Sequence, residues 1–292
     1  MFKRKMKNKT IKNKIKMETE KFLTGNKDSD LLILRRLSDR DILQTCLVNK
    51  YVNRLCHNDD FWRNRFIEKF GIQNLKIKSG TLTWRKFYLL IIKFLDQARH
   101  DNNGAMALAA KEGYRDIVTF FISKGAKSWD NGLNQAAEGG HRDLVDFFIS
   151  KGAKEWNYAM DGAAKGGHQN LVHFFISKGA NDWNDGMVLA AGGGHRDLVN
   201  FFISKGAKDW DDAMKSAAQE GHKDLVDFFV SKGAKDWDGG MIAAARGGHK
   251  DLVDFFISKG AKNWKIASRT ARRKGYNELS NFFRSKMGKK PK

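Results

Sequence analysis

Residues 166–180 read GGHQNLVHFFISKGA, and close variants of this stretch return along the chain every 27 residues. A tryptophan keeps the same spacing and occurs at Trp129, Trp156, Trp183, Trp210, Trp237 and Trp264. An Ala-Ala pair does so too, beginning at Ala109, Ala136, Ala163, Ala190, Ala217 and Ala244. Self-similarity at a fixed period of this length is the signature of stacked structural units. We therefore predict a repeat array over residues 102–284.

Each unit is expected to contain two helices. The first is short and centred on the Ala-Ala pair, as in Ala159–Lys165, and the Gly166-Gly167 pair ends it because glycine tolerates the left-handed conformation. The second covers residues 169–178, and its wide apolar face suits packing against its own partner and two neighbouring units. Stacking then makes one continuous core with polar end units. The degenerate seventh unit, Ala267 to Phe283, is arginine-rich and is predicted to be a C-terminal cap.

The order Gly-His, apolar helix, Gly-Ala in residues 167–180 resembles the ankyrin repeat, and the match recurs in every unit. An ankyrin repeat usually has about 33 residues, with a β-hairpin finger and a Thr-Pro-Leu-His start. Here the period is 27 residues and Thr-Pro is missing, so we expect short or absent fingers. Trp156-Asn157-Tyr158 is expected in the linking region, with the tryptophan as a wedge between repeats. The fold class is thus an all-α solenoid of shortened ankyrin-like repeats.

A histidine recurs once per unit, at His141, His168, His195, His222 and His249. Stacked units would place these side chains in a row with roughly 10 Å between neighbours, because packed helix axes lie about that far apart. This is too far for two of them to share a metal ion. The ankyrin resemblance implies that the histidine supports the turn between the helices, and tyrosine replaces it at Tyr114 and Tyr276. We expect no metal and no cofactor.

The first helices differ between units at two positions four residues apart, which lie on one helix face. The pairs are Asn134 with Glu138, Asp161 with Lys165, Val188 with Gly192, Lys215 with Gln219, and Ile242 with Arg246. Val188 and its neighbour Leu189 make the middle of this stripe apolar. Solenoids bind extended partners along such a surface, so we predict that these side chains, Gly192 excepted, contact an unknown protein target. Neutral drift on a solvated face is the alternative.

Residues 28–71 have no repeat and precede a helical linker, residues 72–101, with a helix from Thr83 to Gln97. Leu34-x-x-Leu37-Ser38-x-x-Asp41-Ile42-Leu43, then Leu55-Cys56, then Asp60-Phe61-Trp62 resembles an F-box, although the Leu-Pro pair that usually starts one is missing. Ser38 or Asp39 can cap the second helix. An ordinary three-helix cap for the solenoid is the alternative. The combination resembles F-box and ankyrin proteins of large cytoplasmic DNA viruses.

The F-box resemblance implies binding to the Skp1 adaptor of cullin-type ubiquitin ligases through apolar helix residues. The residues expected to contact the adaptor are Leu31, Leu34, Leu37, Ile42, Leu43 and Val48. The leading hypothesis is therefore a ligase substrate receptor, in which the repeats hold the target. A ligase-independent scaffold or decoy is the alternative. No phosphate-cradling glycine loop or nucleophile motif occurs in the sequence, so we expect no enzyme, and we expect a monomer.

The formal net charge of +21 is concentrated outside the repeats. Residues 1–27 carry 10 basic and 2 acidic side chains, whereas residues 101–264 carry 20 basic and 22 acidic ones. A nucleic-acid reader is expected to have a basic stripe on its folded face. Nucleic-acid contact through basic, disordered tails at residues 1–27 and 285–292 is therefore only a third hypothesis.

The sequence shows neither a secretory signal nor an apolar run long enough to span a bilayer. The single proline, Pro291, lies at the end of the chain, which favours uninterrupted helices. Cys46 and Cys56 lack a Cys-x-x-Cys motif and are expected to be two buried thiols in a reducing compartment. We expect a cytoplasmic protein, in the host cell if it is viral, with nuclear import through Lys3-Arg4-Lys5 left open.

Overall fold

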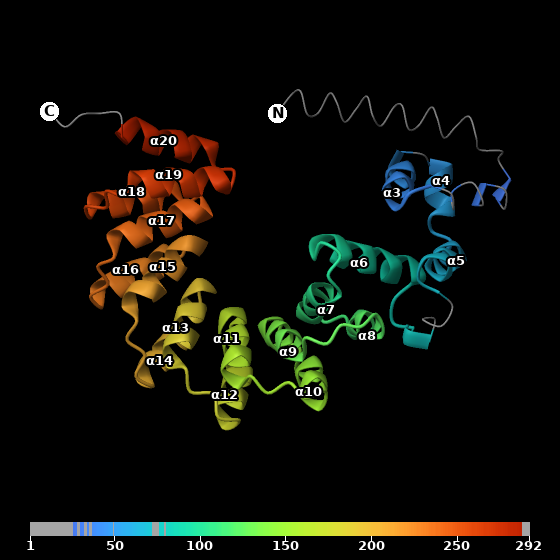
Figure 1. Cartoon of the computed structure of the whole chain (residues 1–292), viewed down its shortest axis with the longest axis horizontal. Helices are drawn as coiled ribbons and strands as arrows, with labels where there is room; N and C mark the ends of the chain where they lie inside the picture. The colour runs from blue at the N-terminus through green and yellow to red at the C-terminus, as the bar shows by residue number, and fades with distance from the viewer. Residues whose placement is uncertain are drawn as a thin grey trace. The chain divides into compact units, whose positions relative to one another are not determined.

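The computed structural model describes residues 26–27, 30–31, 34, 37–48, 50–71, 76–78 and 80–287 (Figure 1). The described residues form helices and turns without a strand, so the expected all-α class is confirmed. Residues 1–25 and 288–292, which hold most of the two expected tails, lie outside them. No helix in the described part of the chain is both long and apolar enough to cross a membrane. The chain divides into two compact units, and the division falls inside the first repeat.

The first unit contains the helices that precede the repeats and part of the first repeat. They are α3 (Asp39–Val48), α4 (Lys50–Leu55), α5 (Asp59–Phe70), α6 (Trp84–Gln97), the start of α7 (Asn102–Lys111) and α8 (Arg115–Ser123). An aromatic cluster forms the core, with the Phe66 ring 5.2–5.8 Å from the rings of Phe70, Trp84, Phe87 and Phe120. Large buried aromatic side chains dominate the stability of such small cores.

Asp39 connects three helices of this unit. Ser38 is the residue that caps α3, since its Oγ accepts from the Asp41 backbone N–H. The Asp39 carboxylate instead accepts from Arg65 on α5, Lys69 on α5 and Tyr88 on α6. Burial alone would raise the pKa of Asp39, but these hydrogen bonds outweigh it and hold the pKa below its usual value. The choice between Ser38 and Asp39 is thereby resolved in favour of Ser38.

The two cysteines are joined as a disulfide between Cys46 and Cys56, so the expectation of two free thiols is wrong. α3 ends at Val48 and α4 starts at Lys50, and this tight corner brings the two Cα atoms to 6.1 Å. That separation lies in the range that a disulfide requires. Disulfides are rare in the cytosol, so the pair gives no support to a reducing compartment.

The second unit contains the remaining repeats, each a helix pair. The first helices are α9 (Trp129–Glu138), α11 (Trp156–Gly166), α13 (Trp183–Gly192), α15 (Trp210–Glu220), α17 (Trp237–Gly247) and α19 (Trp264–Arg273). The second helices are α10 (Arg142–Ser150), α12 (Gln169–Ser177), α14 (Arg196–Ser204), α16 (Lys223–Ser231), α18 (Lys250–Ser258) and α20 (Asn277–Met287). The predicted solenoid of helix pairs is confirmed, and α20 runs three residues past its expected end.

The first helices stack more closely than the second helices, and this difference bends the second unit. Ala163 and Ala164 are fully buried between neighbours, and a side chain at Gly162 would collide with the α9 backbone at Asn134. The second helices carry buried phenylalanines such as Phe175, which hold their helix axes further apart. The first helices consequently lie on the inner side of the arc from α9 to α20 (Figure 1).

The tryptophans do not lie in linkers, so that expectation is wrong. Each is the first residue of a first helix, and Trp210, for example, stacks over Phe229 of its own repeat at 6.5 Å. The links between repeats are short and irregular, as expected for lost fingers, and residues 151–155 make up one of them. The position after the tryptophan holds each link: Asp211 Oδ1 accepts from the backbone N–H groups of Lys235 and Asp236.

This link contact recurs along the unit. The same acceptor role belongs to Asp130, Asn157, Asn184 and Asp238. At the corresponding position of the last unit the residue is Lys265. The sequence shows this pattern, because an Asp or Asn follows each repeat tryptophan whose unit is followed by another unit.

The recurrent histidines have the structural role that the resemblance implies. His195 Nε2 donates to the Lys165 carbonyl of the preceding unit at 3.0 Å. Its ring also lies against Gly167, whose φ of +78° and close approach both require glycine. His141, His168, His222 and His249 make the equivalent bond. The row of histidines therefore fastens each unit to the one before it.

Candidate functional site

A groove of about 490 Å³ opens on the inner side of the second unit, across α13, α15 and α17. Its lining includes five of the ten residues that the sequence predicts to bind a target, namely Val188, Lys215, Gln219, Ile242 and Arg246. They come from three successive first helices. The i, i+4 spacing places them on one helix face, and the stacking of repeats brings the faces together.

The groove has an apolar floor and polar ends. Val188 and Ile242 are half-buried and supply the floor together with Ala243. Lys215 pairs with Asp212 at 2.6 Å and with Asp236 of the next unit at 3.2 Å, and the hydrogen bond to Asp212 raises the Lys215 pKa. At the other end, Arg246 Nη1 donates to Gln219 Oε1 at 3.0 Å. Such a mixture of apolar and polar groups is typical of surfaces that bind protein segments.

Carboxylates lie beside this groove, five of them at the N-terminal ends of α13, α15 and α17 and a sixth, Asp161, in the middle of α11. We call this set the acidic rim, and it consists of Asp161, Asp182, Asp185, Asp209, Asp212 and Asp236. Burial raises the pKa of Asp185, and the negative charges of Asp182, Asp209 and Asp212 raise it further. Of these residues, only Asp161 is among those that the sequence predicts to bind a target. The signal was present, since Asp precedes the tryptophan in three successive units.

Asp161 is the most perturbed carboxyl of the rim. Burial, together with the negative charges of Asp185 and Asp182, raises its pKa to about 7. Its Oδ1 atom is buried and makes no hydrogen bond. A carboxyl in this position changes charge near neutral pH and is ready to accept a hydrogen bond or an ion pair.

Three other residues predicted to bind a target instead make contacts between neighbouring repeats. Asn134 is 6% exposed, and its Nδ2 donates to the Tyr158 carbonyl. Glu138 accepts from Lys111 at 2.7 Å and from Lys165 at 2.9 Å. Burial would raise the Glu138 pKa, but these two lysines lower it overall. Asn134, Glu138 and Lys165 thus join repeats to one another, and Leu189 is half-buried outside the groove lining.

The residues expected to bind an adaptor differ in how far their side chains are buried. Leu34 is 1% exposed and Ile42 is fully buried in the core of the first unit, so neither side chain is free to contact a partner. Leu31 and Leu37 are half-buried. The side chains of Leu43 and Val48 lie outside the described residues. The sequence could not separate these cases, because leucine and isoleucine have the same spacing in a core and in an interface.

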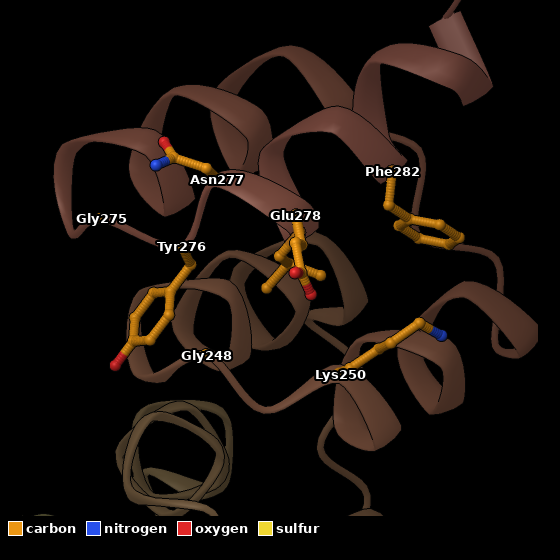
Figure 2. Close-up of a pocket in the computed structure, with 8 residues that line it drawn as sticks. Gly248, Lys250, Gly275, Tyr276, Asn277, Glu278 and Phe282 are labelled. Atoms are coloured by element: carbon orange, nitrogen blue, oxygen red, sulfur yellow. The ribbon is translucent and has the colours of Figure 1, made fainter. Parts of the chain in front are cut away.

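Further grooves lie elsewhere in the part of the chain that the structure describes. One, of about 510 Å³, lies at the end of the array between α18 and α20, where Lys250 lies over the Phe282 ring (Figure 2). Tyr276 there replaces the histidine and covers Gly248, whereas nothing covers Gly275. Another, of about 670 Å³, lies on α6 along Leu89, Ile92 and Leu95. Among the described side chains, no group of three or more His, Cys, Asp or Glu could hold a metal ion.

Comparison with known proteins adds little to this picture. No protein-family model matches the chain, and no curated protein matches it. Among solved structures, the crystal structure of the human ASB11 ankyrin repeat domain is 17% identical, with a TM-score of 0.37. The match covers 64% of this chain and 98% of that domain. The likeness is weak. The helix pairs and the contacts between neighbouring units themselves define the array as a helical repeat solenoid.

Proposed function

We propose that this protein is a protein–protein interaction adaptor and that the groove across α13, α15 and α17 captures a segment of a target protein. The observation that carries this proposal is the meeting of Val188, Lys215 and Ile242, from three different units, in one groove. The helix pairs repeat with little change and provide the frame, while the positions that differ between units give the groove a chemistry of its own. The adaptor supplies position and orientation to its target.

The test is affinity enrichment from cell extract with the full chain and with two double variants. Val188→Asp with Ile242→Asp places charge on the apolar floor and should reduce recovery of a specific partner at least about tenfold, since burying an unpaired charge is costly. The control, Asp224→Lys with Asp251→Lys, changes exposed residues of α16 and α18. Equal recovery with the floor variant and the wild type would contradict the proposal. Circular dichroism checks that all three proteins fold.

For the first unit, we propose docking to a Skp1-type adaptor, which would make the protein a substrate receptor of a cullin-type ubiquitin ligase that acts in the cytoplasm or nucleus. The F-box resemblance of residues 34–63 supports this role. The half-buried Leu31 and Leu37 are the expected contact residues whose side chains are described and partly exposed. Their apolar surface is what an adaptor would cover.

Purified Skp1 and the full chain, mixed in an isothermal titration, test this role. Leu31→Asp with Leu37→Asp should weaken binding at least about tenfold, because a charge replaces apolar contact. Leu89→Asp is the matched control, since Leu89 is a half-buried leucine of α6 in the same unit. Absence of binding by the wild type would remove the ligase role and leave a ligase-independent scaffold or decoy. The burial of Leu34 and Ile42 in the core favours that second candidate.

A further inference from the structure

We infer that the acidic rim and the groove beside it take a basic, extended protein segment, with arginine or lysine side chains on the rim and small apolar side chains against Val188 and Ile242. The inference rests on the proposed function and specifies the chemistry of the partner. Charge complementarity carries it, because acidic residues outnumber basic ones in the groove lining.

One lysine neutralises part of the acidic rim, and the remaining carboxylates carry an excess of negative charge. Lys215 pairs with Asp212 and Asp236, and Arg246 is engaged with Gln219 at the opposite end of the groove. Burial raises the pKa of Asp185, and the negative charges of Asp182, Asp209 and Asp212 raise it further. A cation from a partner would relieve this repulsion.

The spacing of the rim suits an extended chain. From α11 to α17 there are three steps of roughly 10 Å between neighbouring helices, which an extended segment of about nine residues covers at about 3.3 Å per residue. Alternate side chains of such a segment point in opposite directions. The segment can therefore direct apolar side chains to the floor at Val188 and Ile242 while its basic side chains reach the rim.

At Asp161, binding of a positively charged side chain of the partner is coupled to release of a proton from the carboxyl group. Its Oδ1 is buried without a hydrogen bond. The charged groups that raise its pKa to about 7, after burial, are Asp185 and Asp182 of the neighbouring unit. One turn along α11, Lys165 is paired with Glu138 of α9. A cation that binds beside Asp161 lowers its pKa again, so binding releases a proton near neutral pH.

The distribution of charge along the chain determines how a basic segment would be attracted to the groove. The net charge of +21 lies mostly outside the repeats, since residues 101–264 carry 20 basic and 22 acidic side chains, so the array as a whole attracts a basic segment only weakly at long range. Capture of a basic segment must therefore come from local contact with the rim. A nucleic acid, whose phosphates are negative, would be repelled from the rim.

The experiment is an isothermal titration of the full chain with a synthetic peptide of about nine residues that alternates arginine and valine. A peptide that alternates glutamate and valine is the matched probe. Asp185→Asn with Asp212→Asn should weaken binding of the arginine peptide about tenfold. Asp224→Asn with Asp251→Asn removes the same charge from the first turns of α16 and α18, where both residues are exposed, and should leave binding within about twofold.

The pH dependence gives a second readout. Affinity for the arginine peptide should rise several-fold between about pH 6 and pH 8 as Asp161 ionises. Asp161→Asn should flatten this rise. Equal losses in the rim variant and its control, or binding of neither peptide, overturn the inference. Preference for the glutamate peptide, lost with Val188→Asp and Ile242→Asp, also overturns it, but leaves the groove as the target site. The proposed function fails separately, through its own enrichment test.

Discussion

The ionised form of Asp161 lowers the stability of the folded protein. In the unfolded chain its carboxyl ionises near its usual pKa of 3.8, whereas burial and then the charges of Asp185 and Asp182 raise the pKa to about 7 in the folded array. Between these two values the folded state holds a proton that the unfolded state has released. Stability due to this group is therefore greatest at low pH and is lost as the pH rises from about 4 to 7.

Asp161→Asn should accordingly stabilise the protein at pH values above neutral, by about 1–2 kcal/mol, because the amide carries no charge that burial penalises. Near pH 4, where the carboxyl is protonated, the gain should disappear. Urea denaturation at the two pH values measures both effects, with Asp224→Asn as an exposed control. A gain of the same size at both pH values would show that ionisation of Asp161 has no part in it.

At the scale of helices and links, the units are joined by polar contacts that recur with the 27-residue period. His195 bonds to the preceding unit, and Asp211 binds two backbone N–H groups of the following link. The link contact explains why both Asp and Asn occur at that position, since either side chain has the required acceptor oxygen. Lys265 is free of that requirement in the last unit.

Replacement of Asp211 separates this role from charge. Asp211→Ala should lower the free energy of unfolding by about 1–2 kcal/mol, because two backbone N–H groups lose their acceptor. Asp211→Asn keeps the acceptor, as Asn157 and Asn184 do, and should change stability by less than about 0.5 kcal/mol. Urea denaturation compares the three proteins. Equal losses in both variants would mean that charge, and not the hydrogen bonds, holds the link.

At the scale of the whole molecule, the chain consists of two compact units with different means of stabilisation. The second relies on repeated packing and on contacts between neighbouring units. The first has an aromatic core around Phe66, the Asp39 hydrogen bonds and the Cys46–Cys56 disulfide. That disulfide joins residues ten apart, and a loop of this length contributes about 3 kcal/mol by restricting the unfolded chain.

Reduction of the disulfide should therefore destabilise the first unit selectively. Hydrogen exchange of the full chain, followed by mass spectrometry with and without a phosphine reductant, should show faster exchange in α3 and α4 and no change in α13–α17. Cys46→Ser without reductant should give the same pattern. Faster exchange that extends equally into α13–α17 would mean that the two units unfold together.

The repeat period, the pairing of helices and the loss of fingers follow from local patterns, whereas the structural role of the histidines was implied by the ankyrin resemblance. The fixed spacing of alanine and glycine places two helices in each unit, because helix geometry depends on nearby residues. For the same reason, residues four apart such as Lys215 and Gln219 could be placed on one face before their surroundings were known. The groove along α13, α15 and α17 was predictable to that extent. The start of the first helix was misplaced, since α11 begins at Trp156 and not at Ala159.

Only the folded structure decides whether the side chains on those helix faces line the groove or contact neighbouring units. Asn134 and Glu138 occupy the same two positions as Lys215 and Gln219, but Asn134 bonds to the next unit and Glu138 to lysines of the units on both sides. Leu34 and Ile42 lie in a core although their spacing also suits an interface. Burial and the pKa of Asp161 arise from groups in other repeats, and the pairing of the cysteines arises from the corner between α3 and α4. Such effects exist only once packing has brought those groups together and excluded water.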